Sequence, residues 1–453
     1  MLSDPLVEHA QAGAQGTGLR AAAEPIRNAR NIVDLLDYLA TEFATFDDKP
    51  FNPVDSAALS QFCMVRAEGI VPPLRETVSS AAPRLRRTFS ALRKRQLIQK
   101  LSDLVQDRSP SLRGGVRFVD FLRAERYEDM FTGLIPGRVK ENLVALAASP
   151  RFRDMAMRDY ASLFDAERQT QFAAMSFVRE KDFAYIGFRG TDTSAIGWRE
   201  NFNMACQAPV PAQEQAARYL EAVAPNLPCR LFVGGHSKGG NLALYAAMKA
   251  SPAVQDRIEL VYSHDAPGFK AGTFAPDDWN RLSGRIHRTV PQESVVGMLI
   301  ETPIAPHVVK SSEHGIMQHS PFTWEVAGDD FAYLDDVADS AKFTDALISE
   351  WLARYTDSEA AAIVDALFKA IEASGAQNAT DVFFGGAKTV ALVTEAAKNI
   401  DGSARDTLLG ALSALAEVAA RLTAQGLAGA AQNAVSKLVP KTPRTSRSSK
   451  PQA

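Results

Sequence analysis

The segment Arg230–Asn241, RLFVGGHSKGGN, constrains the fold of this chain more than any other part of it. It places Gly-x-Ser-x-Gly, centred on Ser237, between an apolar run that is typical of a strand and NLALYAAMKA, which is typical of a helix. A serine at such a strand-to-helix turn has a strained backbone, and side chains in place of the flanking glycines would collide with the turn. The following N–H then lies at a helix N-terminus, which favours an anion. We interpret the segment as a nucleophile elbow and not as a phosphate-binding loop, since G-x-x-x-x-G-K-[ST] is absent around it.

Short β-rich runs alternate with helical patterns on both sides of this elbow. The expected strands are 172–178, 183–188, 230–234, 258–263, 285–290 and, as the last one, 307–311; the expected helices between them are 212–224 and 239–249. Strands that alternate with helices predict a mostly parallel sheet with helices on both faces. Together with the elbow, this pattern predicts an α/β-hydrolase fold.

Helical patterns flank the predicted sheet at both ends. Apolar residues at helical spacing begin near Asn31, a second helix is expected from Pro53 or Asp55, and residues 115–175 are expected to be helical with short breaks. The basic stretch 84–100 has apolar residues between its charges, which is typical of a solvated helix face. The predicted organisation is a flexible N-terminus (1–30), a helical N-terminal region (31–150), an α/β-hydrolase core (151–335), a helical C-terminal region (336–436) and a disordered basic tail (437–453).

Composition and charge exclude several classes of protein. Fifty basic and 53 acidic residues leave a net charge of −3, which argues against a dedicated nucleic-acid binder. Three cysteines, Cys63, Cys206 and Cys229, have no CxxC spacing and are expected to be reduced thiols in a cytoplasmic protein. We expect no secretory signal and no membrane span, because the Ala-rich stretch near 405–433 is interrupted by Glu417 and Arg421. No His, Cys and Asp cluster has metal-ligand spacing, so neither a metal nor an organic cofactor is expected.

A serine nucleophile needs a base, and the base needs an acid that orients it. His319 is the favoured base because it lies on a loop beyond the expected last strand, and His314 on the same loop is the alternative. His264 and His287 lie in or beside predicted strands and are expected to be structural. The favoured acid is Asp265, which follows a predicted strand and therefore lies at the same sheet edge as the elbow; Glu293 is the alternative acid.

Two backbone N–H groups are candidates for an oxyanion hole. One belongs to Lys238, directly after Ser237, and the other to Thr191, which follows FAYIGFRG and also has a hydroxyl. A merely solvated polar turn at Thr191 is the alternative. The side chains of Lys238 and Arg189 border the elbow and would suit an anionic substrate, although solvent exposure would explain both equally well.

The motifs FRGTDTSAIGWRENFNM, GGHSKGGNLALYAA, YSHDAPGF, VPQESVVGML and VVKSSEHGIMQHSPFTWEV strongly resemble those of the Mbeg1-like family of bacterial α/β-hydrolase-fold proteins, a domain of unknown function. The resemblance runs from about Asn31 to Val326. That family is similar to class 3 lipases, and this similarity implies roles for Thr191 in the oxyanion hole, Ser237 as nucleophile and His319 as base. Class 3 lipases have their acid in a D-x-V-P-like stretch, where this chain offers Glu293. The DAPG at Asp265 instead resembles the acid position of pancreatic-type lipases.

The hypothesis favoured by these residues is a serine hydrolase, similar to esterases and lipases, that cleaves a carboxylic ester or acyl thioester through Ser237, His319 and Asp265. The alternatives are a non-catalytic module that binds an acyl ligand or a protein on a hydrolase fold, and a peptidase or acyltransferase with the same triad. The expected partner is a small-molecule or lipid ester, with peripheral membrane contact through the basic tail. The helical flanks would form a lid or a dimer surface, and the sequence does not decide between these or set the oligomeric state.

Overall fold

The computed structural model of the chain describes residues 33–74, 115–133, 135–179, 182–228, 230–375 and 387–427. Four of the sequence predictions concern residues outside these ranges. They are the flexible N-terminus 1–30, the basic helix 84–100, the basic tail 437–453 and the thiol of Cys229.

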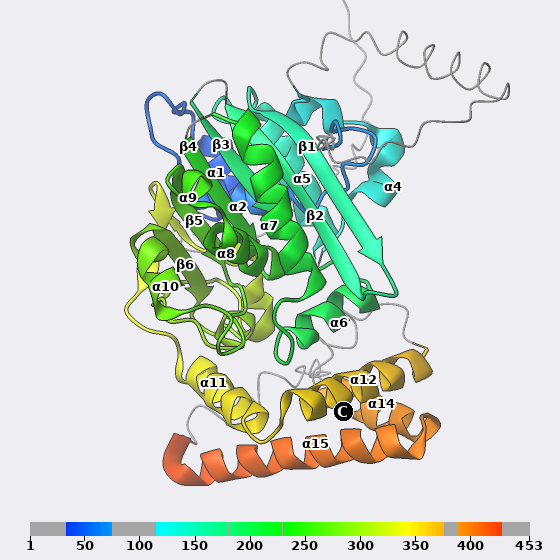
Figure 1. Cartoon of the computed structure of the whole chain (residues 1–453). Helices are drawn as coiled ribbons and strands as arrows, with labels where there is room; N and C mark the ends of the chain where they lie inside the picture. The colour runs from blue at the N-terminus through cyan, green and yellow to red at the C-terminus, as the bar shows by residue number, and fades with distance from the viewer. Residues whose placement is uncertain are drawn as a thin grey trace, which may run out of the picture. The chain divides into compact units, whose positions relative to one another are not determined.

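An eight-stranded sheet in the order β1-β2-β3-β4-β5-β6-β7-β10 forms the centre of the fold (Figure 1). Strands β3 to β7 are parallel to one another, whereas β1 and β2 at one edge and β10 at the other pair antiparallel. The prediction of a mostly parallel sheet is therefore confirmed. The strands are β1 (Ala156–Asp165), β2 (Thr170–Arg179), β3 (Phe183–Phe188), β4 (Arg230–His236), β5 (Ile258–His264), β6 (Ile286–Pro291), β7 (His307–Val309) and β10 (Tyr333–Leu334), with a separate pair β8 (Val326–Ala327) and β9 (Asp330–Phe331).

Two predictions about strands were wrong. Residues 156–165, expected to be helical, form β1, which pairs with β2 and has a bulge between Arg158 and Ala161. Burial along β1 does not alternate regularly, because it is an edge strand with an interrupted register, and so the local sequence lacks the period of two. The second error concerns the last strand of the sheet, which was expected at 307–311. Strand β10 follows it in the chain, pairs with β7 and forms this edge of the sheet.

Helices cover both faces of the sheet, as predicted. Figure 1 shows α7 (Pro211–Val223) and α8 (Lys238–Lys249) in front of the sheet, with α1 (Leu35–Thr41), α2 (Pro53–Phe62) and α5 (Pro136–Ala148) behind it. Neighbouring residues of β2 alternate between the two cores: Ala173 and Met175 pack with α1, α2 and α5, whereas Phe172 and Ala174 pack with α7 and α8. A strand buried on both faces carries a continuous apolar run, which explains why β2 to β5 were recognisable in the sequence.

Shorter helices connect these elements. The remaining α-helices of the sheet region are α4 (Tyr127–Met130), α6 (Ala195–Asn203), α9 (Pro252–Gln255) and α10 (Pro276–Leu282). Single 3₁₀ turns cover Phe118–Phe121, Ala124–Arg126, Ala224–Asn226, Ser283–Arg285, Val296–Met298, Gly315–His319, Pro321–Thr323 and Ala397–Asn399.

In the described residues beyond the sheet the chain forms the helices α11 (Asp339–Leu352), α12 (Asp357–Ala373), α14 (Ala387–Ala396) and α15 (Gly402–Leu422). They pack on one another, and the indole Nε1 of Trp351 donates to the carbonyl of Ala411 at 2.9 Å. Helix α12 also contacts α6 of the sheet region through the rings of Phe368 and Phe202, 5.8 Å apart. Of the residues that the structure describes, Gly402–Gly426 form the one helix long and apolar enough to cross a membrane by length and composition, and 22% of its apolar window is buried.

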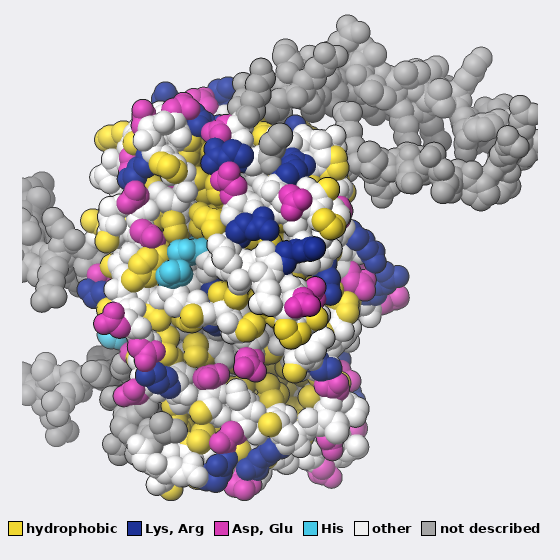
Figure 2. Space-filling view, turned by 60° about the vertical axis from the view of Figure 1, so that its left-hand side comes forward, with side chains coloured by type: hydrophobic (Ala, Val, Ile, Leu, Met, Phe, Trp, Pro, Cys, Tyr) yellow, Lys and Arg dark blue, Asp and Glu magenta, His cyan; other side chains and the backbone are white. Residues whose placement is uncertain are grey.

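Charges of both signs lie on the face of the molecule that Figure 2 draws. Figure 2 shows acidic and basic side chains close to one another over the face that it draws, with hydrophobic side chains between them. This mixture agrees with the net charge of −3 over the whole sequence.

Candidate active site

Ser237 occupies the turn between β4 and α8 in the strained conformation expected of a nucleophile elbow. Its φ is 58° and its ψ −132°, in a region that a residue with a side chain rarely adopts. A Cβ at Gly235 would lie 2.3 Å from the carbonyl carbon of Gly239, and one at Gly239 would lie 2.2 Å from the carbonyl oxygen of Phe188. The steric reason given for both glycines of the motif is therefore confirmed.

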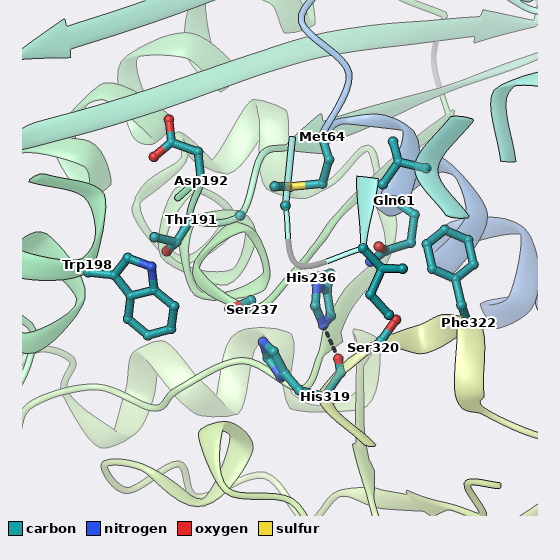
Figure 3. Close-up of a pocket in the computed structure, with 14 residues that line it drawn as sticks. Gln61, Met64, Thr191, Asp192, Trp198, His236, Ser237, His319, Ser320 and Phe322 are labelled. Carbon is teal, nitrogen blue, oxygen red and sulfur yellow. Dashed lines mark hydrogen bonds between the residues drawn. The ribbon is translucent and has the colours of Figure 1, made fainter. Parts of the chain in front are cut away.

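The structure brings together the favoured base and the favoured acid. His319 ends the 3₁₀ turn Gly315–His319, and its Nδ1 lies 2.6 Å from Oδ2 of Asp265, which directly follows β5. Both side chains are buried. A carboxylate accepts hydrogen bonds, so Nδ1 of His319 carries the proton and Nε2 is left as an acceptor. Figure 3 shows the His319 ring next to Ser237.

Asp265 is held by two further donors. Its Oδ1 accepts from the hydroxyl of Ser294 at 2.6 Å and from the backbone N–H of Gly297 at 3.0 Å, and its backbone N–H donates to Thr289. Its φ of 43° is a left-handed value that costs conformational energy in a residue with a side chain. These contacts leave Oδ2 for His319. Sequence reasoning missed Ser294 and Gly297, although both lie in the VPQESVVG stretch that drew attention to Glu293.

Neither of the alternative residues joins this arrangement. Glu293 accepts from the backbone N–H of Gly315 at 2.6 Å, and its other carboxylate oxygen lies 3.8 Å from Nδ1 of His314. The side chain of His314 is 70% exposed. Glu293 therefore stabilises the loop that carries the base, and the structure does not pair it with His319.

His236, directly before Ser237, positions the base from the other side. Its Nε2 lies 2.6 Å from the carbonyl oxygen of His319, which can only accept, so Nε2 is the donor (Figure 3). Burial lowers the pKa of His236 well below its usual value, and His319 and His264 nearby lower it further. A neutral His236 thus fixes the backbone of His319. No sequence signal indicates this role, because the residue occupies a variable position of the motif.

The two candidate oxyanion donors lie at the same edge of the sheet as Ser237. Thr191 follows β3 and lines the same cavity as Ser237, and its hydroxyl oxygen accepts from Nδ2 of Asn201 in α6 at 2.6 Å. This bond occupies an acceptor site of the hydroxyl and leaves its hydrogen available for donation. Lys238 is the first residue of α8, so its N–H has no partner within the helix. Asn201 was not singled out in the sequence.

The side chains of Lys238 and Arg189 have neither of the two roles considered for them. Lys238 is buried, and its Nζ forms an ion pair with Glu200 at 3.0 Å. The same Nζ donates to the backbone carbonyl oxygen and to Oε1 of Gln171. Arg189 is also buried and donates to the carbonyls of Cys63 and Val65. Solvent exposure was therefore wrong for both side chains, and their contacts with buried polar groups give no support to an anionic substrate.

His264 and His287 lie away from the cavity, as expected of structural residues. Nε2 of His264 lies 3.0 Å from the hydroxyl oxygen of Ser56, and burial lowers the pKa of His264 to about 3. Burial and, to a smaller extent, His307, whose ring stacks on that of His287 at 4.4 Å, together lower the pKa of His287 to about 4.

Ser237 and His319 open onto a cavity of ≈ 50 Å³. The N-terminal helical region supplies a large part of its wall through residues at the end of α2 and in α5. The apolar lining residues are Met64, Ile135, Val139, Trp198 and Phe322, and the polar ones beside Ser237, His236 and His319 are Gln61, Thr191, Asp192 and Ser320. The described residues contain no group of three or more His, Cys, Asp or Glu side chains that could hold a metal ion.

The elbow between β4 and α8, at the edge of a sheet whose strands β3 to β7 are parallel, defines an α/β-hydrolase fold. Comparison with known families agrees, because residues 146–369 match the model of the Mbeg1-like family. The resemblance found in the sequence is therefore confirmed over residues 146–369.

Solved lipases show a distant likeness. The native Rhizomucor miehei lipase–propeptide complex is 19% identical over 41% of this chain and 64% of that lipase, so the match spans less than two thirds of its length, with a TM-score of 0.24. A fungal lipase–inhibitor complex is 19% identical over 43% of this chain and 77% of its own (TM-score 0.28). The lipase of Rhizopus microsporus var. chinensis is 17% identical over 61% and 92% (TM-score 0.23). The comparison with curated proteins gave no match.

Proposed function

We propose that this chain is a serine hydrolase that cleaves a carboxylic ester or acyl thioester with a short acyl group. One observation carries the proposal: Nδ1 of buried His319 is bonded to Asp265 at 2.6 Å, in a cavity that His319 shares with the strained Ser237. A hydroxyl, an imidazole and a carboxylate in this order are the parts of a nucleophilic triad.

In the proposed reaction the Ser237 hydroxyl attacks the carbonyl carbon of the substrate. Its proton moves to Nε2 of His319, while Asp265 stabilises the imidazolium that forms. The negative charge that develops on the carbonyl oxygen is stabilised by the N–H groups of Lys238 and Thr191. The bond to the alcohol or thiol then breaks, and His319 protonates the leaving group. Water, activated by His319, releases the acid from Ser237 in the same manner.

The size and lining of the cavity support a short acyl group. On this measure of volume one water needs about 10–15 Å³, so the cavity of ≈ 50 Å³ has room for only a few groups of that size. Rigid side chains such as Trp198 and Phe322 line it. A long acyl chain would need these walls to move, which costs packing free energy.

Hydrolysis of a chain-length series tests this proposal. For p-nitrophenyl acetate, butyrate, octanoate and palmitate, we expect kcat/KM to be highest for acetate or butyrate and at least about tenfold lower for octanoate, because the larger acyl group must displace the cavity walls. A spectrophotometric assay of p-nitrophenol release measures this. If none of the four esters were hydrolysed, the proposed reaction would be contradicted. If kcat/KM were highest for palmitate, only the short acyl group would be contradicted.

The cellular location is part of the same proposal. The thiols of Cys63 and Cys206 are free and buried in the fold. Unpaired thiols favour a reducing compartment, and we place the protein in the cytoplasm.

A further inference from the structure

Gln61 lines the cavity that holds Ser237, and its side chain has a hydrogen-bond donor without a partner. Its side chain is 5% exposed, and its Nε2 is buried with no hydrogen-bond partner. In the described ranges, seven buried side-chain nitrogen and oxygen atoms lack a hydrogen-bond partner. Of the residues that carry these seven atoms, Gln61 is the one that lines the cavity. A buried amide N–H without a partner costs free energy, so such a group calls for an explanation.

The amide end of Gln61 faces the reacting groups. Figure 3 shows it turned toward His236 and Ser320, on the opposite side of Ser237 from Thr191 and Trp198. Ile135, Val139 and Phe322 line the same cavity and have no side-chain hydrogen-bonding group. A polar atom of a bound molecule in this cavity would therefore find a donor at Gln61 and none at these three residues.

Helix α2, which carries Gln61, is fixed rigidly to the sheet. The hydroxyl oxygens of Ser60 and Ser56 lie 2.7 Å and 3.2 Å, respectively, from the hydroxyl oxygen of Tyr185 in β3. At the start of the helix, Asp55 forms an ion pair with Arg151 at 2.6 Å, and both side chains are fully buried. A donor held by such contacts loses little entropy when it binds a substrate atom, which is the condition for a residue that sets specificity.

We propose that Gln61 donates a hydrogen bond to an oxygen atom of the substrate close to the scissile bond, and that the substrate is an ester or thioester whose short arm contains such an oxygen, as in alkoxy, hydroxy or oxo groups. The NH₂ of an amide can only donate, so it selects an acceptor. A substrate without the oxygen leaves the N–H unpaired and is disfavoured. This inference rests on the proposed hydrolase function and narrows its substrate class.

Two pairs of esters of equal chain length test the inference on either arm of the substrate. The acyl pair is p-nitrophenyl methoxyacetate and p-nitrophenyl butyrate; the alcohol pair is 2-methoxyethyl acetate and butyl acetate. In each pair an oxygen replaces one methylene group. The ratio of kcat/KM within a pair is compared between the wild-type chain and Gln61→Met, so that the intrinsic reactivity of the esters cancels.

We expect the ratio of one pair to fall about tenfold in Gln61→Met, because the variant keeps the size of the side chain and removes the donor. Gln61→Leu, which also removes the donor and introduces no charge, should give the same fall, and it replaces Gln61→Met should that variant fail to fold. Gln207→Met, at an exposed position beyond α6, is the matched control and should leave both ratios unchanged.

The outcomes separate this inference from the proposed function. Hydrolysis with both ratios unchanged in the folded Gln61 variants would overturn the role of Gln61 and leave the hydrolase intact. A folded wild-type chain that neither hydrolyses any of the four esters nor reacts at Ser237 with a fluorophosphonate would overturn the function and this inference with it.

Discussion

Ser237→Ala is expected to lower kcat/KM for p-nitrophenyl butyrate on the order of 10⁴-fold or more. The variant removes the oxygen that forms the covalent bond to the acyl group, and His319 and Asp265 without it have no nucleophile to activate. Residual turnover would come from binding and the oxyanion donors alone. Initial rates at several ester concentrations, with circular dichroism to verify folding, provide the measurement.

Ser312→Ala is the control for this variant. Ser312 is exposed, and its hydroxyl donates to the carbonyl of Thr323 on the surface of the same loop that carries His319. We expect its kcat/KM to remain within about twofold of wild type, because surface substitutions change stability by at most about 0.5 kcal/mol. A Ser237→Ala protein with wild-type activity would show that the hydrolysis has another source.

Asp265→Asn is expected to lower kcat on the order of 10⁴-fold with the fold intact. The asparagine oxygen can still accept from Ser294 and Gly297, so its NH₂ group takes the position that faces His319. That amide donates to Nδ1 and forces the proton of the imidazole onto Nε2, the wrong tautomer for accepting the Ser237 proton. The rate of p-nitrophenyl butyrate hydrolysis and the melting temperature are the two readouts.

Glu293→Gln is the matched comparison for the acid. Glu293 accepts from the backbone N–H of Gly315, which a glutamine oxygen can also do, whereas Nδ1 of His319 is bonded to Asp265. We expect kcat to change by less than about fivefold. A large loss in Glu293→Gln with little loss in Asp265→Asn would assign the acid to the class 3 lipase position and contradict the geometry described above.

The elbow and the central strands could be predicted because their signals are local. The glycines of Gly-x-Ser-x-Gly are required by contacts within the turn and with the neighbouring strand end at Phe188. Strands β2 to β5 are buried on both faces and therefore read as apolar runs. His319 and Asp265 could be predicted as base and acid because each comes after a predicted strand. The carboxyl ends of the parallel strands lie at the same sheet edge as the elbow.

The remaining features depend on contacts that are distant in sequence. Strand β1 is an edge strand with a bulge, so its sequence lacks the regular alternation that predicts a strand. The ion pair of Lys238 with Glu200 joins residues 38 positions apart, and nothing near Lys238 in the sequence marks its side chain as buried. The same holds for His236, whose partner is a carbonyl 83 positions away.

The N-terminal helical region also gains a role that the sequence did not suggest. Its helices α1, α2 and α5 pack on one face of the sheet in the same core as Phe177 and Tyr185. Through Gln61, Met64 and Val139 it supplies one side of the cavity that holds Ser237. Lid and dimer surface were the two roles considered for this region, and lining the substrate cavity is a third that the contacts favour.

The central claim is that Ser237 is an activated nucleophile, and covalent labelling of the wild-type chain tests it most directly. The protein is incubated with a fluorophosphonate, its intact mass is measured, and the modified peptide is mapped. We predict one adduct per chain, located on Ser237, and no adduct in Ser237→Ala. A folded wild-type protein that takes up no label, or that carries its label on another residue and retains it in Ser237→Ala, would contradict the account.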